Sequence, residues 1–144
     1  MLSNTSRYAI RAVIYLALNN EANAKIGIKQ ISQDLAIPTP FLGKILQTLA
    51  KHKMLASTKG PHGGFSIEKN AYDISLMDIV EIIDGIDSFN NCILGLRTCT
   101  KEENHCPIHQ NYATIRENLK DLFQTENIGE LANRIRESNS SLVL

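Results

Sequence analysis

Apolar residues recur at helical spacing in three stretches of the first third of the chain. Residues 8–18 are apolar on most faces, which predicts a helix that is buried on several sides. Residues 28–35 carry apolar side chains three and four positions apart and predict a short second helix. The same spacing returns from residue 40 to about 53, where we expect Thr39 to cap a third helix and Pro40 to take its first position. Two short helices around a tight turn indicate a helix-turn-helix.

Two short strand-like runs follow the third helix. Residues 55–59 and 65–67 flank the sequence Gly-Pro-His-Gly-Gly at 60–64, and this pattern predicts a β-hairpin. A hairpin directly after a helix-turn-helix is a wing, and a tip with few side chains allows close approach to a phosphate backbone. The sequence therefore predicts a mainly α fold with a small β-hairpin wing, in which residues 1–75 form a winged helix-turn-helix.

The second half of the chain is predicted to be helical on either side of an irregular segment. Residues 76–84 form an amphipathic pattern that we expect Ser75 to cap and Gly85 to end. After Pro107 a long helix is predicted to about residue 125. Its apolar side chains recur in steps of four and three, at Ile108, Tyr112, Ile115, Leu119 and Leu122. A last short helix is predicted around residues 128–135.

The long helix carries a narrow heptad stripe, which is typical of a helix that pairs with another helix. The simplest partner is the same helix of a second copy, so we expect a two-fold homodimer. The alternative is a helix that packs on its own domain. A length of 144 residues favours one compact domain, in which residues 1–75 bind DNA and residues 76–144 hold the dimerisation helices and a cofactor-binding loop.

The balance of charge differs between the two halves. Residues 1–75 carry nine Lys or Arg and four Asp or Glu, a net of +5, whereas residues 76–144 carry six and eleven, a net of −5. The basic half predicts a polyanionic partner, and a two-fold winged-helix dimer suits double-stranded DNA with a palindromic operator. No apolar run reaches the length of a membrane span and no secretory pattern opens the chain, so we expect a cytoplasmic protein without membrane contact.

Eight residues are candidates for DNA contact. Base edges in the major groove require side chains that donate and accept hydrogen bonds, and cations meet phosphates. Base contacts are expected on the third helix, from Thr39, Gly43, Lys44 and Gln47. Phosphate or minor-groove contacts are expected from the helix end and the wing, at Lys51, Lys59, His62 and Gly63. The alternative is a winged helix used for protein contacts, whose lysines are only a solvated face.

The three cysteines of the chain, Cys92, Cys99 and Cys106, lie in one irregular segment with six residues between each pair. Zinc sites usually contain Cys-x-x-Cys pairs, which are absent here, whereas wide spacing in a loop suits an iron–sulfur cluster of the 2Fe–2S or 4Fe–4S type. Three thiolates leave a fourth ligand to be found. His109, one helical turn after Cys106, is a better candidate than His105. From spacing alone, inert buried thiols or a redox pair are the alternatives.

Four stretches of this chain resemble the Rrf-two family of winged-helix transcriptional regulators. They are Arg7-Tyr8-Ala9-Ile10-Arg11-Ala12, Lys59-Gly60-Pro61-His62-Gly63-Gly64-Phe65, Asp78-Ile79-Val80 followed by Gly85, and the run from Cys92 to Cys99 followed by Cys106-Pro107-Ile108-His109. The resemblance covers most of the chain. It implies a homodimeric transcription factor with crossed long helices. With three cysteines present, it also implies an iron–sulfur cluster that controls DNA binding and senses nitric oxide, redox state or iron–sulfur status.

The chain departs from the family pattern at three points. Its cysteines are somewhat further apart than those of the family's cluster-assembly regulators. Arg7 occupies the position at which an acidic residue of the partner completes the cluster in the nitric-oxide sensors, so that ligand is not carried over. Gly43 replaces a glutamate that is common in the recognition helix, so an operator sequence is not carried over either.

Two other functions fit the residues. One is a cluster-free regulator whose cysteines form a thiol redox switch, and the other is a protein-binding winged-helix adaptor with a structural zinc site. Iron and sulfide content distinguishes the first from a cluster protein, and zinc content with no retention of DNA distinguishes the second. The sequence shows no phosphate-binding loop, nucleophile–base motif or paired carboxylates, so we do not expect an enzyme.

Overall fold

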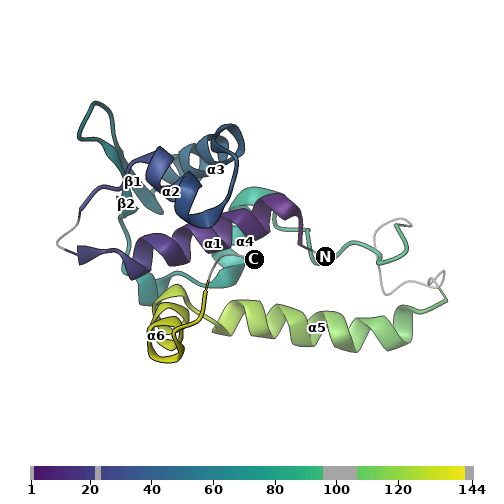
Figure 1. The fold of residues 1–144 in the computed structure, drawn as a ribbon. Helices are drawn as coiled ribbons and strands as arrows, with labels where there is room; N and C mark the ends of the chain where they lie inside the picture. The colour runs from purple at the N-terminus through teal and green to yellow at the C-terminus, as the bar shows by residue number, and fades with distance from the viewer. Residues whose placement is uncertain (1, 22–23, 96–106, 142–144) are drawn as a thin grey trace.

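The computed structural model describes residues 2–21, 24–95 and 107–141. Its elements are, in chain order, α1 (Asn4–Leu18), α2 (Ile28–Leu35), α3 (Thr39–Lys51), β1 (Leu55–Thr58), β2 (Gly64–Ile67), the 3₁₀ turn η2 (Ala71–Asp73), α4 (Leu76–Asp84), α5 (His109–Thr125) and α6 (Ile128–Ser138). This confirms the mainly α fold with a β-hairpin wing. Figure 1 shows α2, α3 and the wing above α1, with α5 and α6 below it. No helix within the described ranges combines the length and the apolarity that a membrane span needs.

α1 begins earlier than the apolar pattern predicts, because polar side chains hold its first turn. The Ser3 hydroxyl accepts a hydrogen bond from the Ser6 N–H (3.0 Å) and donates one to Asp84 at the end of α4 (2.5 Å). Arg11, which interrupts the apolar run, donates from Nη2 to the Leu35 carbonyl at the end of α2 (2.6 Å). The last carbonyls of a helix have no partner within it, so a guanidinium placed there attaches α2 to α1.

The helix-turn-helix of α2 and α3 is confirmed, but the predicted cap of α3 is wrong. The N-cap residue is Pro38, whose backbone is not helical (φ −57°, ψ 129°), and Thr39 already belongs to the helix. The Pro38 carbonyl accepts from the Leu42 N–H (3.1 Å), which starts the helix one residue earlier and puts Pro40 at its second position. The Thr39 hydroxyl shares a hydrogen bond with the Ser32 hydroxyl across the turn (2.9 Å).

The wing is confirmed as an antiparallel hairpin in which β1 pairs with β2 over all four residues of each strand. The loop before α2 adds a further bridge, because the N–H and C=O groups of Ile26 exchange hydrogen bonds with Phe65 (both 2.9 Å). Gly64 permits this approach, since a Cβ on its backbone (φ +150°) would lie 2.3 Å from the Ile26 carbonyl oxygen. We call α1, α2, α3 and the wing together the head. The bridge to Ile26 fixes the base of the wing to the rest of the head, and residues 59–63 form the projecting tip of the wing.

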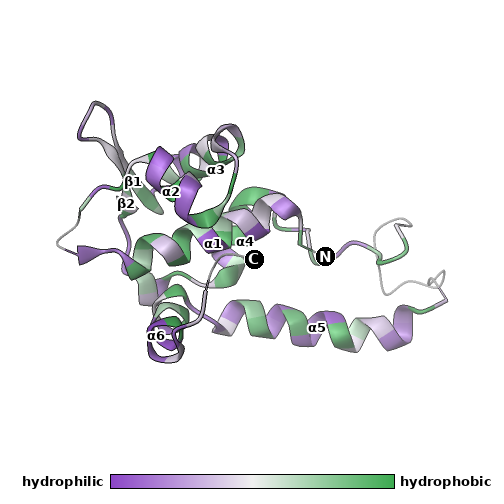
Figure 2. Cartoon of the chain, in the orientation of Figure 1, coloured by the Kyte–Doolittle hydropathy of each residue, from purple (hydrophilic) through white to green (hydrophobic). Residues whose placement is uncertain are grey.

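One hydrophobic core joins the two halves of the chain. Leu16 of α1, Leu46 of α3 and Ile128 of α6 are at most 1% exposed and belong to the same cluster. The short helix predicted around residues 128–135 is thus confirmed as α6, which packs beside α1. Figure 2 shows mostly apolar residues on α1 and α4 inside the fold and polar residues on the outer face of α2.

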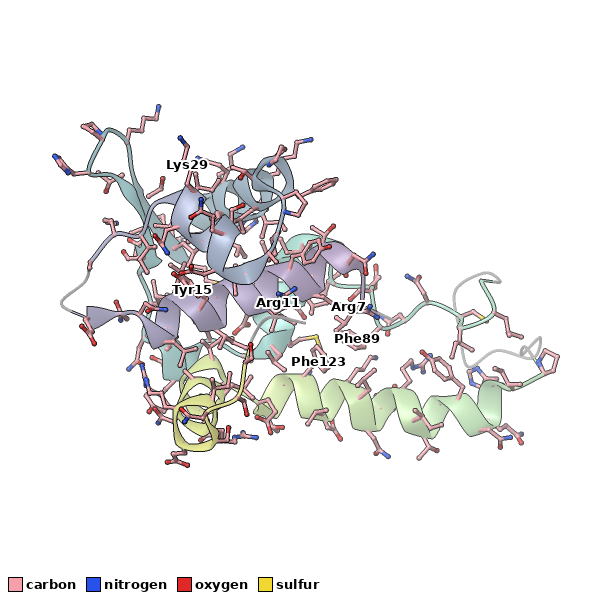
Figure 3. The ribbon with its side chains drawn as sticks, viewed as in Figure 1. Arg7, Arg11, Tyr15, Lys29, Phe89 and Phe123 are labelled. Atoms are coloured by element: carbon pink, nitrogen blue, oxygen red, sulfur yellow. The ribbon has the colours of Figure 1, made fainter. Side chains whose placement is uncertain are left out.

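α4 and the segment after it attach α5 to the fold. α4 has the predicted bounds, with Ser75 as its N-cap and Gly85 after its end. A second, smaller apolar cluster connects the two helices, and its buried members are Met77, Val80, Phe89 and Phe123. The rings of Phe89 and Phe123 have centroids 5.2 Å apart and planes tilted by 59°, an arrangement that aromatic pairs favour (Figure 3).

α5 is present as predicted, but its predicted stripe is only partly covered. The buried residues of α5 are instead spaced by seven, at His109, Arg116 and Phe123. Of the predicted stripe, Tyr112 and Leu119 are half-buried. The other three members are exposed, Ile108 by 36%, Ile115 by 62% and Leu122 by 48%. Figure 1 shows that α5 extends beyond α1, α2 and α3. Within the described part of the chain, the three exposed side chains form an uncovered aliphatic row.

Candidate DNA interface and sensor site

The exposed face of α3 carries residues that the sequence predicts to contact DNA. Lys44, Gln47 and Lys51 are exposed, and so is Thr39 in the first turn. The residues that hold α3 against the head lie on the opposite face and are buried, namely Leu42, Ile45, Leu46 and Leu49. Two ammonium groups and an amide therefore face solvent. Their N–H groups can donate hydrogen bonds to phosphates and to base edges.

Gly43 lies on the side of α3 that faces α2. It is half-buried, and a Cβ at this position would lie 3.3 Å from Cδ1 of Ile28. That separation is tight, so a larger residue would press on the Ile28 side chain. The glycine therefore lets the two helices of the helix-turn-helix approach closely, and it offers only its backbone to a ligand.

The wing tip presents Lys59 and His62 to solvent. Gly63 is half-buried and donates its N–H to the Gly60 carbonyl (3.0 Å). A Cβ on Gly63 would lie 2.1 Å from the Thr58 carbonyl oxygen, so a side chain does not fit on this backbone. The tight turn made by the glycines thus holds Lys59 and His62 on the outside of a narrow tip.

Lys29 of α2 is a basic residue that sequence reasoning missed. It is exposed, and Figure 3 shows it on the side of α2 toward which the wing projects. The sequence does indicate that Lys29 is exposed. It follows Ile28 and so lies off the apolar stripe of α2, which is the first helix of the helix-turn-helix. We use the name basic face for the exposed lysines of α2, α3 and the wing, which are Lys29, Lys44, Lys51 and Lys59.

Tyr15 and Asp34 connect α1 to α2 near the contact made by Arg11. The Tyr15 hydroxyl donates to one Asp34 carboxylate oxygen (2.5 Å), and the Gln30 amide donates to both oxygens (2.9 Å each). Burial, followed by the hydrogen bond to Asp34 and its negative charge, raises the pKa of Tyr15 to about 12. The hydrogen bonds from Tyr15 and then from Gln30 lower the pKa of Asp34. These contacts orient α2, and through the turn α3, relative to α1.

Two of the four predicted cofactor ligands are described, and both are withdrawn from solvent. Cys92 is 7% exposed and His109 is 9% exposed. The aliphatic residues beside the cysteine have the opposite environment, since Ile93 is 47% and Leu94 53% exposed. The thiol and the imidazole are therefore enclosed, while the two aliphatic side chains that follow the cysteine face water.

The segment that bears Cys92 is attached to α5. The Asn90 side-chain oxygen accepts a hydrogen bond from Lys120 Nζ of α5 (2.8 Å). The Gly95 N–H donates to the Cys92 carbonyl (2.9 Å), which closes a turn around the cysteine. The first residues of the cysteine segment are therefore attached to α5, the helix that follows this segment in the chain.

The ligand atoms of the described residues are compatible with an inorganic cofactor, but they do not distinguish zinc from an iron–sulfur cluster. Within the described ranges no three His, Cys, Asp or Glu side chains gather as a metal site, and the other predicted ligands, Cys99 and Cys106, lie outside those ranges together with His105. One thiol and one imidazole suit both zinc and iron–sulfur centres. The N-cap of α5 is Ile108, whose side chain makes no capping hydrogen bond, and the N-terminus of a helix favours negative charge.

Arg7 offers no ligand atom to such a centre. Its side chain is exposed on α1, and its guanidinium donates to the Asn4 side-chain oxygen (3.5 Å). A guanidinium carries donors only and stays protonated, so it does not replace the acidic ligand that nitric-oxide sensors of the resembled family use.

The fold and the basic face define a winged-helix protein of the DNA-binding regulator class. Residues 2–134 match the Rrf2 family, whose description is iron-dependent transcriptional regulator. The chain therefore belongs to the Rrf2 family, and the resemblance found in the sequence is confirmed.

Individual relatives agree with this assignment. The chain is 34% identical over 134 residues to an HTH-type transcriptional regulator of Aquifex aeolicus, with 92% of both chains covered. It is 26% identical over 132 residues to the regulator IscR of Escherichia coli, covering 92% of this chain and 80% of that one. The solved structure of CymR, the global cysteine regulator of B. subtilis, shares the fold with a TM-score of 0.74 at 20% identity, over 93% of this chain and 97% of that one. The protein is thus a transcriptional regulator, and the relatives reported are regulators rather than enzymes.

Proposed function

We propose that this protein binds double-stranded DNA as a homodimer, with one winged head on each half of a palindromic operator. The observation that supports DNA contact is the basic face, in which the lysines of α2, α3 and the wing are all exposed. The base-contacting residues in this proposal are Thr39, Gly43 through its backbone, Lys44 and Gln47. The phosphate-contacting residues in this proposal are Lys51, Lys59, His62 and Gly63, and we add Lys29 because it is exposed on the same side of the molecule as the wing.

The proposed dimer is formed by α5. Ile108, Ile115 and Leu122 are spaced by seven residues and exposed, so they lie in one row along the helix. An exposed aliphatic row of this period is the side that a second helix covers in a coiled-coil contact. In this proposal residues 1–75 bind DNA and residues 76–144 provide the dimer contact and the sensor, although one core connects the two parts.

We further propose that Cys92, Cys99 and Cys106 bind an iron–sulfur cluster, with His109 as the fourth ligand. The enclosure of Cys92 and His109 carries this proposal, in a chain whose family is described as iron-dependent. When bound, such a cluster supplies a centre that reacts with nitric oxide and oxygen. The four side chains would tie the cysteine segment to the first turn of α5.

Loss of that tie would change how the two heads are oriented. With the tie in place, α5 is held at both ends, by the ligands at its start and by the Phe123 cluster near its end. Without the tie, the contacts near its end remain, which are the Phe123 cluster and the hydrogen bond from Lys120 to Asn90. DNA affinity then changes by the difference in free energy between the two states, and a coupling of about 1–3 kcal/mol, roughly 5- to 150-fold in affinity, is enough for a switch.

The visible spectrum of anaerobically purified protein tests the ligands. We expect wild-type protein to be coloured and to contain iron and acid-labile sulfide, and Cys92→Ala to lose most of the absorption. Ile93→Ala is the matched control, because it changes an exposed neighbour in the same turn. A Cys92→Ala protein with an undiminished chromophore would remove Cys92 from the ligand set, and colourless wild-type protein would remove the cluster.

Retention of duplex DNA tests the DNA-binding proposal. We expect binding that weakens steeply as salt concentration rises, because lysines that contact phosphates release bound counterions. A protein-binding adaptor with structural zinc predicts zinc in the purified protein and no salt-dependent retention. Zinc content and salt dependence measured on one preparation separate the two functions.

A cluster-free thiol switch is the second candidate for the sensor. It is favoured by the likeness of the fold to CymR, which is described as a global cysteine regulator. In that case the anaerobic protein would contain neither iron nor sulfide, yet DNA binding would differ between reduced and oxidised cysteines. Iron and sulfide analysis therefore decides between the two candidates before any DNA is added.

A further inference from the structure

A cavity of about 470 Å³ lies along α5, between its first and third turns. It is lined by His109, Ala113, Thr114, Arg116, Glu117 and Asn118. Arg116 is the unusual member, because it is only 8% exposed although it carries a permanent positive charge. Its Nη1 atom is enclosed and has no hydrogen-bond partner.

The carboxylate beside Arg116 does not satisfy it. Glu117 Oε1 lies 3.2 Å from Nε of Arg116 and 3.6 Å from Lys120 Nζ, so one exposed carboxylate is shared by two cations. The contact is made on the Nε side and leaves Nη1 unpaired. A buried guanidinium nitrogen without an acceptor is unfavourable, so the site lacks an anionic group.

The geometry of α5 directs the guanidinium into the cavity. Side chains of a helix lean toward its N-terminus, so Arg116 extends over the preceding turn toward the end of α5 that carries His109. The planar fork of a guanidinium binds two oxygens of one group at once.

We propose that this cavity is an anion-binding site that takes one carboxylate or phosphate-like oxyanion, with Arg116 as its principal ligand. The anion has two sources with the same chemistry, a small oxyanion from solution or a carboxylate side chain of a second copy of this chain. The site does not depend on the proposed cluster, with which it shares only the lining residue His109. Its test therefore uses full-length protein prepared free of iron.

Thermal unfolding in inorganic phosphate, compared with chloride at equal ionic strength, tests the first source. At a phosphate concentration tenfold above its dissociation constant, we expect the wild-type melting temperature to rise by roughly 3 °C. Arg116→Gln should abolish the rise. Arg116→Lys should keep the charge and the fold but bind at least about tenfold more weakly, because an ammonium lacks the fork. Arg134→Gln is the matched control, since it removes a guanidinium from α6 outside the cavity.

Sedimentation at graded protein concentration tests the second source. If phosphate does not raise the melting temperature, Arg116→Gln should weaken self-association at least about tenfold relative to Arg134→Gln, which assigns the anion to the second copy. The proposal is overturned if neither phosphate nor self-association distinguishes wild-type protein from Arg116→Gln and Arg116→Lys. Arg116→Lys keeps this outcome informative if Arg116→Gln does not fold.

Discussion

α3 and α5 carry similar apolar stripes that end in opposite environments. The stripe of α3 contains Leu42, Leu46 and Leu49, each 0% exposed. In the stripe of α5, Ile115 is 62% and Leu122 48% exposed. The difference arises because α3 lies within the head against α1, α2 and β1, whereas α5 is held by α4 and extends beyond α1, α2 and α3 (Figure 1).

This comparison separates two consequences of amphipathicity. An apolar stripe shows that one face of a helix needs cover, because exposed aliphatic area is unfavourable in water. It does not show whether the cover comes from the same chain or from another one. In α3 the cover is intramolecular and stabilises the fold, and in α5 we propose that it comes from a second copy. Substitutions in the two stripes should therefore have different readouts.

The largest effect is expected from Leu46→Ala in α3. Removing a fully buried leucine leaves a cavity, so the free energy of unfolding should fall by about 3 kcal/mol. Leu122→Ala in α5 makes the same chemical change at an exposed position and should alter monomer stability by less than about 0.5 kcal/mol. Urea denaturation at a low protein concentration measures both. Equal losses would show that the two stripes do not differ in the way described.

Ile115→Asp should break the proposed dimer without unfolding the monomer. A carboxylate in the centre of the exposed row would have to be buried unpaired at the helix contact, so the dimer dissociation constant should rise about 30-fold or more. Gln124→Asp places the same charge at an exposed position of α5 off the row and should leave association unchanged. Analytical ultracentrifugation with circular dichroism provides the measurement. An Ile115→Asp protein that still associates like wild type would rule out this row as the contact.

Gly63→Ala should disturb the wing and weaken DNA binding about tenfold. The new methyl group would collide with the Thr58 carbonyl oxygen, so the tip must open and move Lys59 and His62. Gly27→Ala is the control, because a Cβ there meets nothing within 4 Å. Fluorescence anisotropy with labelled duplex DNA gives both affinities. Unchanged binding by Gly63→Ala would exclude the wing tip from the DNA contact.

Lys44→Ala should weaken DNA binding by about 1 kcal/mol, or roughly fivefold, and lower the slope of log affinity against log salt by about one. The reason is the loss of one ammonium group from the exposed face of α3. Lys69→Ala removes an exposed lysine outside the basic face and should change neither quantity. A salt titration of both variants is sufficient. Identical slopes for the two would contradict the assignment of Lys44.

The smallest effect is expected from Tyr15→Phe, seen only in the dependence of stability on pH. Because the pKa of Tyr15 is raised to about 12, its contribution is complete below pH 10 and is lost as pH rises toward 12. The pKa of Asp34 is lowered, so its contribution is present above the ordinary aspartate pKa and is lost as pH falls below it. Tyr15→Phe should remove the alkaline loss and reduce the acid one. Melting temperatures across pH measure the difference.

Most of the head could be predicted from the sequence because its signals are local. Helical periodicity, the glycine-rich tip and the Ser75 cap each depend on residues a few positions apart. The contacts that position the head were missed because they are distant in sequence. Arg11 reaches a carbonyl 24 residues away and Tyr15 a carboxylate 19 residues away. The cap of α3 is Pro38 rather than Thr39 because the helix already includes Thr39, and residue type alone does not specify that backbone boundary.

The candidate sites divide in the same way. The cysteine set, the lysines of α3 and the wing tip were all selected from residue type and spacing. Lys29 was not, because it lies in the first helix of the helix-turn-helix and outside the recognition helix and the wing. The burial of Arg116 was not, because a charged residue in an amphipathic helix is ordinarily expected on the solvent side. Only the arrangement of α5 shows that this guanidinium is enclosed.

The sequence alone determined which segments are helical, where the wing lies, which family motifs are present and which thiols and imidazoles could meet. The tertiary structure alone decided which apolar stripe is covered within the chain and which polar groups are enclosed. The physical reason is that periodicity reports a property of one element, whereas burial depends on which other elements lie against it. Distant parts of the chain supply that cover, and their approach is settled by packing rather than by local spacing.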